Sequence, residues 1–235
     1  MGSNEFGSQF VPLVFLEYIY ILKNTVFALF YPGCQVQSLD LVFAVDASAG
    51  VGLANFLQLR DFVRSSSWQF TINRDVTQIA LVAYGSRART VFALDTYTNN
   101  SALLQAINQM PFLGDVASAS SALLHIHSDV MTVQKGARPG VSKVVVLLTN
   151  GGGMEDAAAP ARQLRDNGVT VFVVVIGDAE RDTLLRVAGS PSYLVHISSY
   201  EDLQRYQDLI TERICEGENV LSLLFVLLPA ACGKL

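Results

Sequence analysis

LDLVFAVDAS, at residues 39–48, is a nearly continuous apolar run that ends in a carboxylate and a hydroxyl. A short apolar run rich in branched residues is typical of a strand that is covered on both faces, as in a parallel sheet. We predict this strand over Leu39–Val45, so that Asp46 and Ser48 lie on the turn that leaves it. Open parallel sheets bind their ligands just beyond the carboxyl ends of the strands. The tip of this strand is therefore the first candidate site.

The segments that follow alternate between short apolar runs and longer amphipathic stretches. Further strands are predicted over Val76–Tyr84, Ala88–Leu94, Val144–Leu148, Val169–Ile176 and Tyr193–Ile197. Helices are predicted over Leu53–Ser65, Ser101–Met110, Ser118–Thr132, Ala157–Asn167, Leu184–Ala188 and Glu201–Ile214. Gly85-Ser86-Arg87 is a hairpin signal between the second and third strands. This order predicts an α/β fold, with a doubly wound, mostly parallel central sheet, one antiparallel edge strand and helices on both faces, in a Rossmann-like arrangement.

Composition limits the domain organisation and the classes of partner. The chain has 235 residues, is 51% hydrophobic and has a formal net charge of −5, which allows one sizeable core. We expect a single domain over residues 36–215. Residues 1–35 are expected to be a leader, a tag or an unassigned apolar segment, and residues 216–235 an apolar C-terminal tail. The basic residues form no stripe, which disfavours nucleic acid as a partner, and neither end predicts a membrane span.

The three cysteines bear on the compartment. Cys34 precedes the first predicted strand, and Cys215 follows the last predicted helix. Because the ends of a compact domain often lie close together, we expect a disulfide between Cys34 and Cys215, which would imply an oxidising, secreted setting. Three unpaired cytosolic thiols are the alternative. Cys232 would remain free or pair with another chain.

Two further features lie at predicted helix ends. Asn99-Asn100-Ser101 is an N-glycosylation sequon in a predicted loop, and Asn99 is its acceptor. Capping of the following helix by the Asn or Ser side chain is an equally good explanation of the same residues. Trp68 follows three serines at the end of the first predicted helix, where we expect it to be a packed aromatic residue, with a recognition hot spot as the alternative.

Together these segments resemble the von Willebrand factor type A (VWA) domain family. The resemblance covers roughly residues 38–215 and rests on the motifs at residues 39–48, 79–86, 142–151, 169–177 and 184–189. Residues 137–143 are most similar to the secreted, extracellular-matrix branch of that family. The resemblance implies a secreted domain whose partners are extracellular-matrix proteins such as collagen, or other secreted proteins.

The family resemblance also implies a metal-ion-dependent adhesion site. That site uses an Asp-x-Ser-x-Ser loop, a threonine from a second loop and an aspartate after the central strand. Asp46 and Ser48 match the first two ligands, but Gly50, Ala117 and Asn150 stand where the other three are expected. Gly50 and Ala117 have no side-chain oxygen, and Asn150 offers a neutral one, whereas Mg²⁺ usually requires carboxylate ligands. We therefore expect a degenerate site with no cofactor, at which Mg²⁺ or Ca²⁺ would bind weakly.

The sequence favours a secreted interaction or adhesion domain that binds matrix or plasma proteins without a bridging cation. One alternative is a metal-dependent adhesive domain with relaxed ligands, in which Asp115 or Ser118 supplies a missing oxygen. A second is a structural assembly module that self-associates, for example through Cys232. A third is a nucleotide-dependent enzyme. Gly50-Val51-Gly52 lacks the third glycine of a dinucleotide-binding turn, because Asn55 stands there. No catalytic residue is assigned, and we expect no enzyme.

Overall fold

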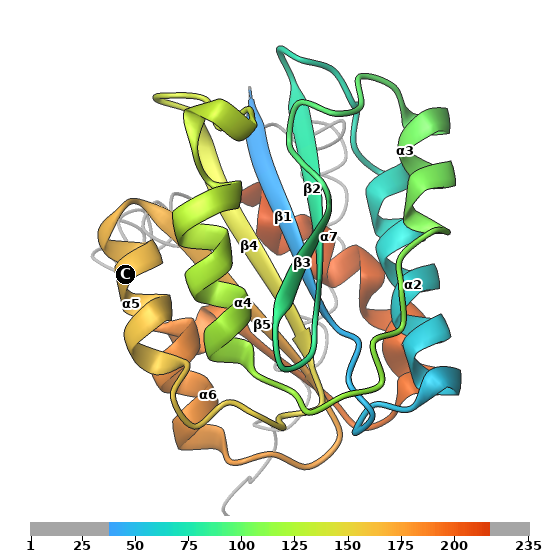
Figure 1. Cartoon of the computed structure of the whole chain (residues 1–235), viewed down its shortest axis with the longest axis vertical. Coiled ribbons are helices and arrows are strands. Elements are labelled where there is room, and N and C mark those ends of the chain that lie inside the picture. Colours follow the sequence, from blue (N-terminus) through green and yellow to red (C-terminus); the bar gives the residue numbers. More distant parts are fainter. Residues whose placement is uncertain (1–37, 217–235) are drawn as a thin grey trace, which may run out of the picture. The chain divides into compact units, whose positions relative to one another are not determined.

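A six-stranded sheet forms the centre of the domain (Figure 1). The computed structural model describes residues 38–216, which lie within one compact unit of the chain. The strand order is β3-β2-β1-β4-β5-β6. The bounds are β1 Leu39–Asp46, β2 Thr77–Tyr84, β3 Ala88–Phe92, β4 Ser142–Thr149, β5 Val169–Ile176 and β6 Leu194–Ile197. All neighbouring strands are parallel except β2 and β3, which pair antiparallel at one edge. The predicted sheet is confirmed.

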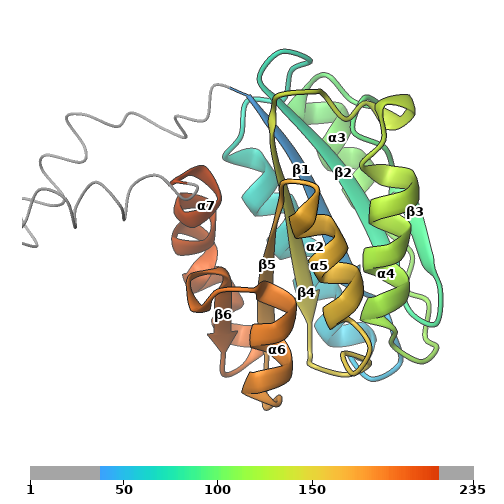
Figure 2. The same ribbon diagram turned by 90° about the vertical axis from the view of Figure 1, so that its left-hand side faces the viewer.

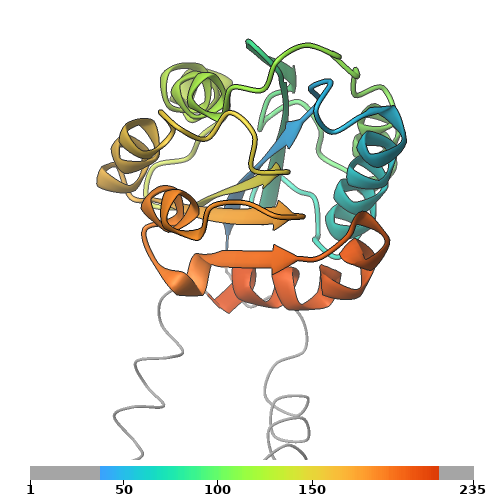
Figure 3. The same ribbon diagram turned by 90° about the horizontal axis from the view of Figure 1, so that it is seen from below.

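Helices cover both faces of the sheet (Figures 2 and 3). One layer contains α2 Leu53–Trp68, α3 Asn100–Ile107 and α7 Gln207–Glu216. The other contains α4 Ala119–His125, α5 Ala158–Asp166 and α6 Arg181–Ala188. Four short helical turns complete the described chain: η1 Ile126–Val130, η2 Val133–Lys135, η3 Pro191–Tyr193 and η4 Tyr200–Tyr206. This three-layer arrangement is the predicted doubly wound fold.

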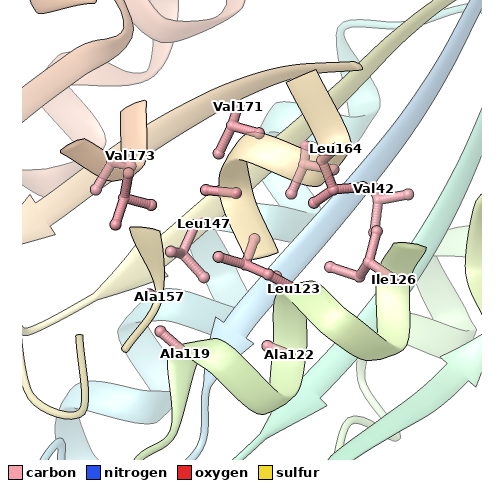
Figure 4. Packing of buried hydrophobic residues seen from close by; sticks show 14 of the residues in the cluster. Val42, Ala119, Ala122, Leu123, Ile126, Leu147, Ala157, Leu164, Val171 and Val173 are labelled. Carbon is pink, nitrogen blue, oxygen red and sulfur yellow. The ribbon is translucent and has the colours of Figure 1, made fainter. Parts of the chain in front are cut away.

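The central strand is buried along its whole length, which explains its apolar sequence. Successive side chains of a strand point to opposite faces, so β1 contributes to both cores. Its Val42 packs in a cluster with Leu123 of α4, Leu147 of β4 and Val173 of β5 (Figure 4). On the other helical layer, the buried apolar residues of α2 recur at helical spacing: Phe56, Leu59, Phe62 and Val63. A strand covered on both faces needs apolar residues throughout. The apolar run at residues 39–45 therefore predicts where β1 lies.

Two predicted helices are each divided in the structure. The helix expected over Ser118–Thr132 ends as an α-helix at His125 and continues as the π-helical turn η1, in which the Met131 amide donates to the Ile126 carbonyl at 2.8 Å. The helix expected over Glu201–Ile214 begins as the 3₁₀-helix η4 before α7. These segments are only five and seven residues long, which is too short for the spacing of their few apolar residues to reveal a change of pitch. The apolar pattern therefore does not distinguish them.

The expectation for Trp68 is wrong. Its side chain is 66% exposed at the last position of α2. The buried face of this helix ends with Ser66 and Ser67, and Trp68 falls outside it.

A buried ion pair joins several elements at the end of the sheet where the parallel strands begin. Asp40 of β1 is fully buried and lies 2.7 Å from Nη2 of Arg138, in the loop before β4. The Arg138 backbone amide donates to the other oxygen of the same carboxylate at 2.7 Å. The guanidinium also donates to the carbonyls of Leu39, Val76 and Arg74. One side chain therefore joins β1, the segment before β2 and the loop before β4. The hydrophobic pattern of the sequence does not indicate this pair.

Some expectations concern residues outside the described range. Cys34 and Cys232 lie there, as do the expected leader and all but the first residue of the expected C-terminal tail. Cys215 is disulfide-bonded, but its pairing with Cys34 stays a prediction. Between residues 38 and 216, no helix combines the length and apolar character needed to cross a membrane.

Candidate functional site

The loops that follow β1 and β4 meet the loop before α4 at one edge of the sheet, at the lower end of Figure 1. Together they surround an open depression, which is lined by Ser48, Ala49, Gly50, Asp115, Val116, Ala117, Asn150, Gly152, Gly153 and Glu155. Four of the five predicted site residues thus line one hollow, and the fifth, Asp46, is the buried last residue of β1. The structure brings the predicted set together.

The Asp46 carboxylate is only half satisfied. Its Oδ1 accepts the Ser48 backbone amide at 3.0 Å, whereas its Oδ2 has no hydrogen-bond partner among the described residues. The Ser48 hydroxyl lies close enough to interact with the carboxylate, but it also makes no hydrogen bond to any described atom. Burial raises the pKa of Asp46, and the charge of Asp115 adds to this, while the hydroxyl and amide of Ser48 oppose it. The site therefore holds a carboxyl group whose charged form is poorly solvated.

Two tyrosines lie within electrostatic reach of this carboxylate. Burial raises the pKa of Tyr200 to about 12, and the charge of Asp46 adds to the effect. Burial also raises the pKa of Tyr84, whose hydroxyl donates to the Leu148 carbonyl at 3.3 Å. The Tyr200 hydroxyl has no hydrogen-bond partner within residues 38–216. Both tyrosines therefore remain protonated and neutral at neutral pH, and they place no charge near Asp46.

Asp115 and Ser118, the two residues considered as substitute ligands, already have structural roles. Oδ2 of Asp115 accepts the Ser86 hydroxyl at 2.5 Å and the Ser86 amide at 3.1 Å. These bonds lower the pKa of Asp115, and the bond from the Ser86 hydroxyl has the larger effect. The Asp115 carbonyl also accepts the Ala49 amide at 2.7 Å, which joins the two loops. Ser118 caps α4 by accepting the Ser121 amide at 3.2 Å. Of the side-chain oxygens of Asp115 and Ser118, only Oδ1 of Asp115 has no hydrogen-bond partner among the described atoms.

The remaining positions supply little oxygen to the hollow. Oδ1 of Asn150 accepts the Gly152 amide at 2.9 Å in a local turn. A Cβ atom at Gly50 would lie 3.4 Å from Nδ2 of Asn150, so the amide occupies the space beside this glycine. Val116 and Ala117 both line the hollow, and neither side chain contains oxygen. Across the described residues, no group of three or more His, Cys, Asp or Glu side chains is arranged to hold a metal ion.

Asp46→Asn is expected to raise the free energy of unfolding by roughly 1 kcal/mol at neutral pH, because it removes a buried charge that has one unpaired oxygen. An acid whose pKa is raised in the folded state binds more protons when folded than when unfolded. Wild-type stability should therefore fall as the pH rises from 3.8, the ordinary aspartate value, through the folded-state pKa. Urea unfolding across this pH range measures both effects, with the exposed Asp166→Asn as the control. A variant less stable than wild type at neutral pH would contradict the expectation.

Comparison with known sequences agrees with this geometry. Residues 40–210 match the family described as the von Willebrand factor type A domain. The chain is 53% identical over 195 residues to von Willebrand factor A domain-containing protein 2 of Xenopus laevis, covering 83% of this chain and 25% of that protein. The human protein of the same name is 54% identical over 184 residues, with coverage of 78% and 24%. The chain thus spans about a quarter of the length of these relatives.

More distant relatives share the same region. The human collagen alpha-5(VI) chain is 30% identical over 183 residues, which are 78% of this chain and 7% of that one. Among solved structures, proximal thread matrix protein 1 from the mussel byssus superposes with a TM-score of 0.73 at 23% identity, covering 78% of this chain and 48% of that one. A further structure of that mussel protein, with a zinc-occupied adhesion motif, gives 0.72 at 24% identity, covering 78% and 49%. The mussel structures support the fold alone, whereas the profile match and the closer sequences support the lineage. The chain belongs to the von Willebrand factor type A domain family.

Proposed function

We propose that this domain is an extracellular protein-binding module that attaches to matrix or plasma proteins, such as collagen, without a bridging cation. Membership of the VWA family supports a role in protein interaction and adhesion. The relatives include chains of collagens VI and XII. These relationships favour an extracellular location and a matrix protein as the partner class.

The cation-independent part of the proposal rests on the side-chain oxygens at the candidate site. Mg²⁺ needs near-ideal octahedral coordination, and Ca²⁺ takes six to eight oxygen ligands. The buried unpaired oxygens here belong to Asp46, Ser48 and Asp115, and the remaining carboxylate oxygen of Asp115 is held by Ser86. Glu155 adds one exposed carboxylate at the rim of the hollow. The oxygen of Asn150 is already bonded to a backbone amide. The small number of free side-chain oxygens supports binding without a resident Mg²⁺ or Ca²⁺.

Exposed apolar side chains at the same edge offer a different mode of contact. Val116, on the rim of the hollow, is 78% exposed, and Leu53, at the start of α2 just after the β1 loop, is 56% exposed. Interfaces between proteins commonly combine such apolar contacts with a polar rim. Here Glu155 and the backbone of the glycine-rich loop after β4 would provide the polar contacts.

The test measures binding of the chain to immobilised collagen and to other purified matrix proteins, with either a chelator or millimolar Mg²⁺ present. We expect the dissociation constant to change by less than about twofold, which is under 0.5 kcal/mol. Val116→Asp should weaken binding by roughly tenfold or more, because it puts a charge at the contact. Val133→Asp is the matched control, since Val133 is 69% exposed in η2, away from the candidate site. A tenfold loss on chelation would overturn cation independence. Absence of saturable binding to every matrix protein would overturn the partner class.

The metal-dependent alternative is favoured by one observation, the unpaired oxygens of Asp46 and Ser48. Calorimetric titration of the chain with Mg²⁺, Ca²⁺ and Mn²⁺ distinguishes the two hypotheses. Micromolar affinity for any of these ions, abolished by Asp46→Ala together with partner binding, would establish the alternative. Under our proposal no ion binds in that range, and Asp46→Ala leaves the affinity for the partner unchanged.

A further inference from the structure

The single N-glycosylation sequon of the chain lies on an accessible part of the fold. Asn99-Asn100-Ser101 is the only N-x-Ser/Thr triplet in the 235 residues. Asn99 is exposed in an extended segment, with φ −151° and ψ 151°, immediately before α3. Ser101 is exposed as well. A sequon of this kind, on a surface segment of a secreted protein, is an acceptor for N-linked glycans.

The two neighbouring asparagines have different roles. The Asn100 side chain is used at both ends, because its Nδ2 donates to the Phe70 carbonyl at 2.9 Å and its Oδ1 accepts the Ile72 amide at 3.2 Å. This anchors the start of α3 to the segment after α2. Asn99 uses only Oδ1, which accepts the Ala102 amide at 3.0 Å as the cap of α3.

The cap and a glycan therefore need different atoms of the same amide. Glycan transfer forms a bond from Nδ2 of Asn99 to the anomeric carbon of a lipid-linked oligosaccharide pyrophosphate. The bond from that carbon to the pyrophosphate oxygen breaks, one amide proton is released, and no atom changes oxidation state. Oδ1 keeps its lone pairs and continues to accept the Ala102 amide. Capping and glycosylation, the two explanations of this sequence, are thus compatible.

We propose that Asn99 carries an N-linked glycan while its side-chain oxygen caps α3. The modification rests on the extracellular location in the proposed function, since only chains that enter the secretory pathway meet the oligosaccharide donor. It does not depend on the identity of the partner or on the absence of a metal ion, because Asn99 lies outside the candidate site.

The test expresses the full chain behind a secretion leader in mammalian cells. We expect reduced electrophoretic mobility that peptide-N-glycosidase F reverses, and tandem mass spectrometry should then find aspartate at position 99. Ser101→Ala removes the sequon but leaves the Asn99 cap, whereas Ser101→Thr keeps both. Asn99→Asp removes the glycan and retains a capping oxygen, and Asn99→Ala removes both. The mobility shift should persist only in wild type and Ser101→Thr.

Thermal unfolding of the enzymatically deglycosylated wild type and of these variants reports the cap separately. Asn99→Ala should lower the melting temperature relative to Ser101→Ala and Asn99→Asp. Equal melting temperatures for all three would overturn the dual role of Asn99, and a secreted wild type without a glycan would overturn the modification. The matrix-binding assay on the same preparations is an independent result: a glycosylated chain that binds no matrix protein contradicts the proposed function and leaves this inference intact.

Discussion

Arg138→Ala is expected to lower the free energy of unfolding by about 3–5 kcal/mol, because it leaves the fully buried Asp40 carboxylate without its countercharge. The substitution also removes the donors that bind the carbonyls of Leu39, Val76 and Arg74. Domains of this kind have roughly 5–15 kcal/mol of stability in total. The variant should therefore unfold at a much lower urea concentration, as followed by circular dichroism.

Two comparisons separate this effect from the general cost of losing an arginine. Arg205→Ala breaks the Arg205–Asp202 pair, in which the Arg205 side chain is 80% exposed, and should cost less than about 1 kcal/mol. The double variant Asp40→Leu with Arg138→Met replaces both charges by apolar groups, and should be more stable than Arg138→Ala alone. If Arg138→Ala and Arg205→Ala had equal effects, the buried pair would not be important for stability.

Gly153→Ala is expected to cost about 2–5 kcal/mol and to deform the candidate site. Gly153 has φ +67°, which costs an L-residue about 1–2 kcal/mol. Its new Cβ would also lie only 2.2 Å from the Ala117 carbonyl oxygen, and relieving such a backbone clash typically adds about 1–3 kcal/mol. The Gly153 carbonyl accepts the Ala119 amide at 2.9 Å, so any displacement separates the loop after β4 from the start of α4. Urea unfolding measures the cost, and partner binding should weaken in parallel.

Gly168→Ala isolates the backbone component of that prediction. Gly168 has φ +75° just after α5, and a Cβ there would meet nothing within 4 Å. We therefore expect a loss of about 1–2 kcal/mol with unchanged partner binding. Equal losses at the two glycines would show that the contact with Ala117 contributes nothing.

The sequence predicts the sheet well because its strands are buried on both faces. Val169–Ile176 was predicted with the observed bounds of β5, and Leu39–Val45 differs from β1 by one residue. Eight consecutive apolar or β-branched residues between a glycine and a glycine leave few alternatives for β5. The sequence also predicts that the site residues lie close together, because they follow parallel strands whose carboxyl ends lie side by side.

The partners of individual polar side chains were not predictable. Asp40 stands out in an apolar strand as a charge that needs a partner, but Arg138 lies 98 positions away in a loop, among many other basic residues. Asp115 looked available as a metal ligand, and only the fold reveals that Ser86, 29 positions away, binds it. Such pairings depend on how loops meet in space, which hydrophobic periodicity does not encode.

The Asp40–Arg138 pair lies where the parallel strands begin, and the candidate site lies at their carboxyl ends. This separation affects how the domain can evolve. The pair joins the elements where the strands begin, so this part of the domain's stability does not come from the loops that form the candidate site. A lineage can then exchange ligand oxygens for glycine, alanine or asparagine and keep its architecture. New specificities can arise on those loops without passing through unfolded intermediates, since function resides in the site and not in the fold that supports it.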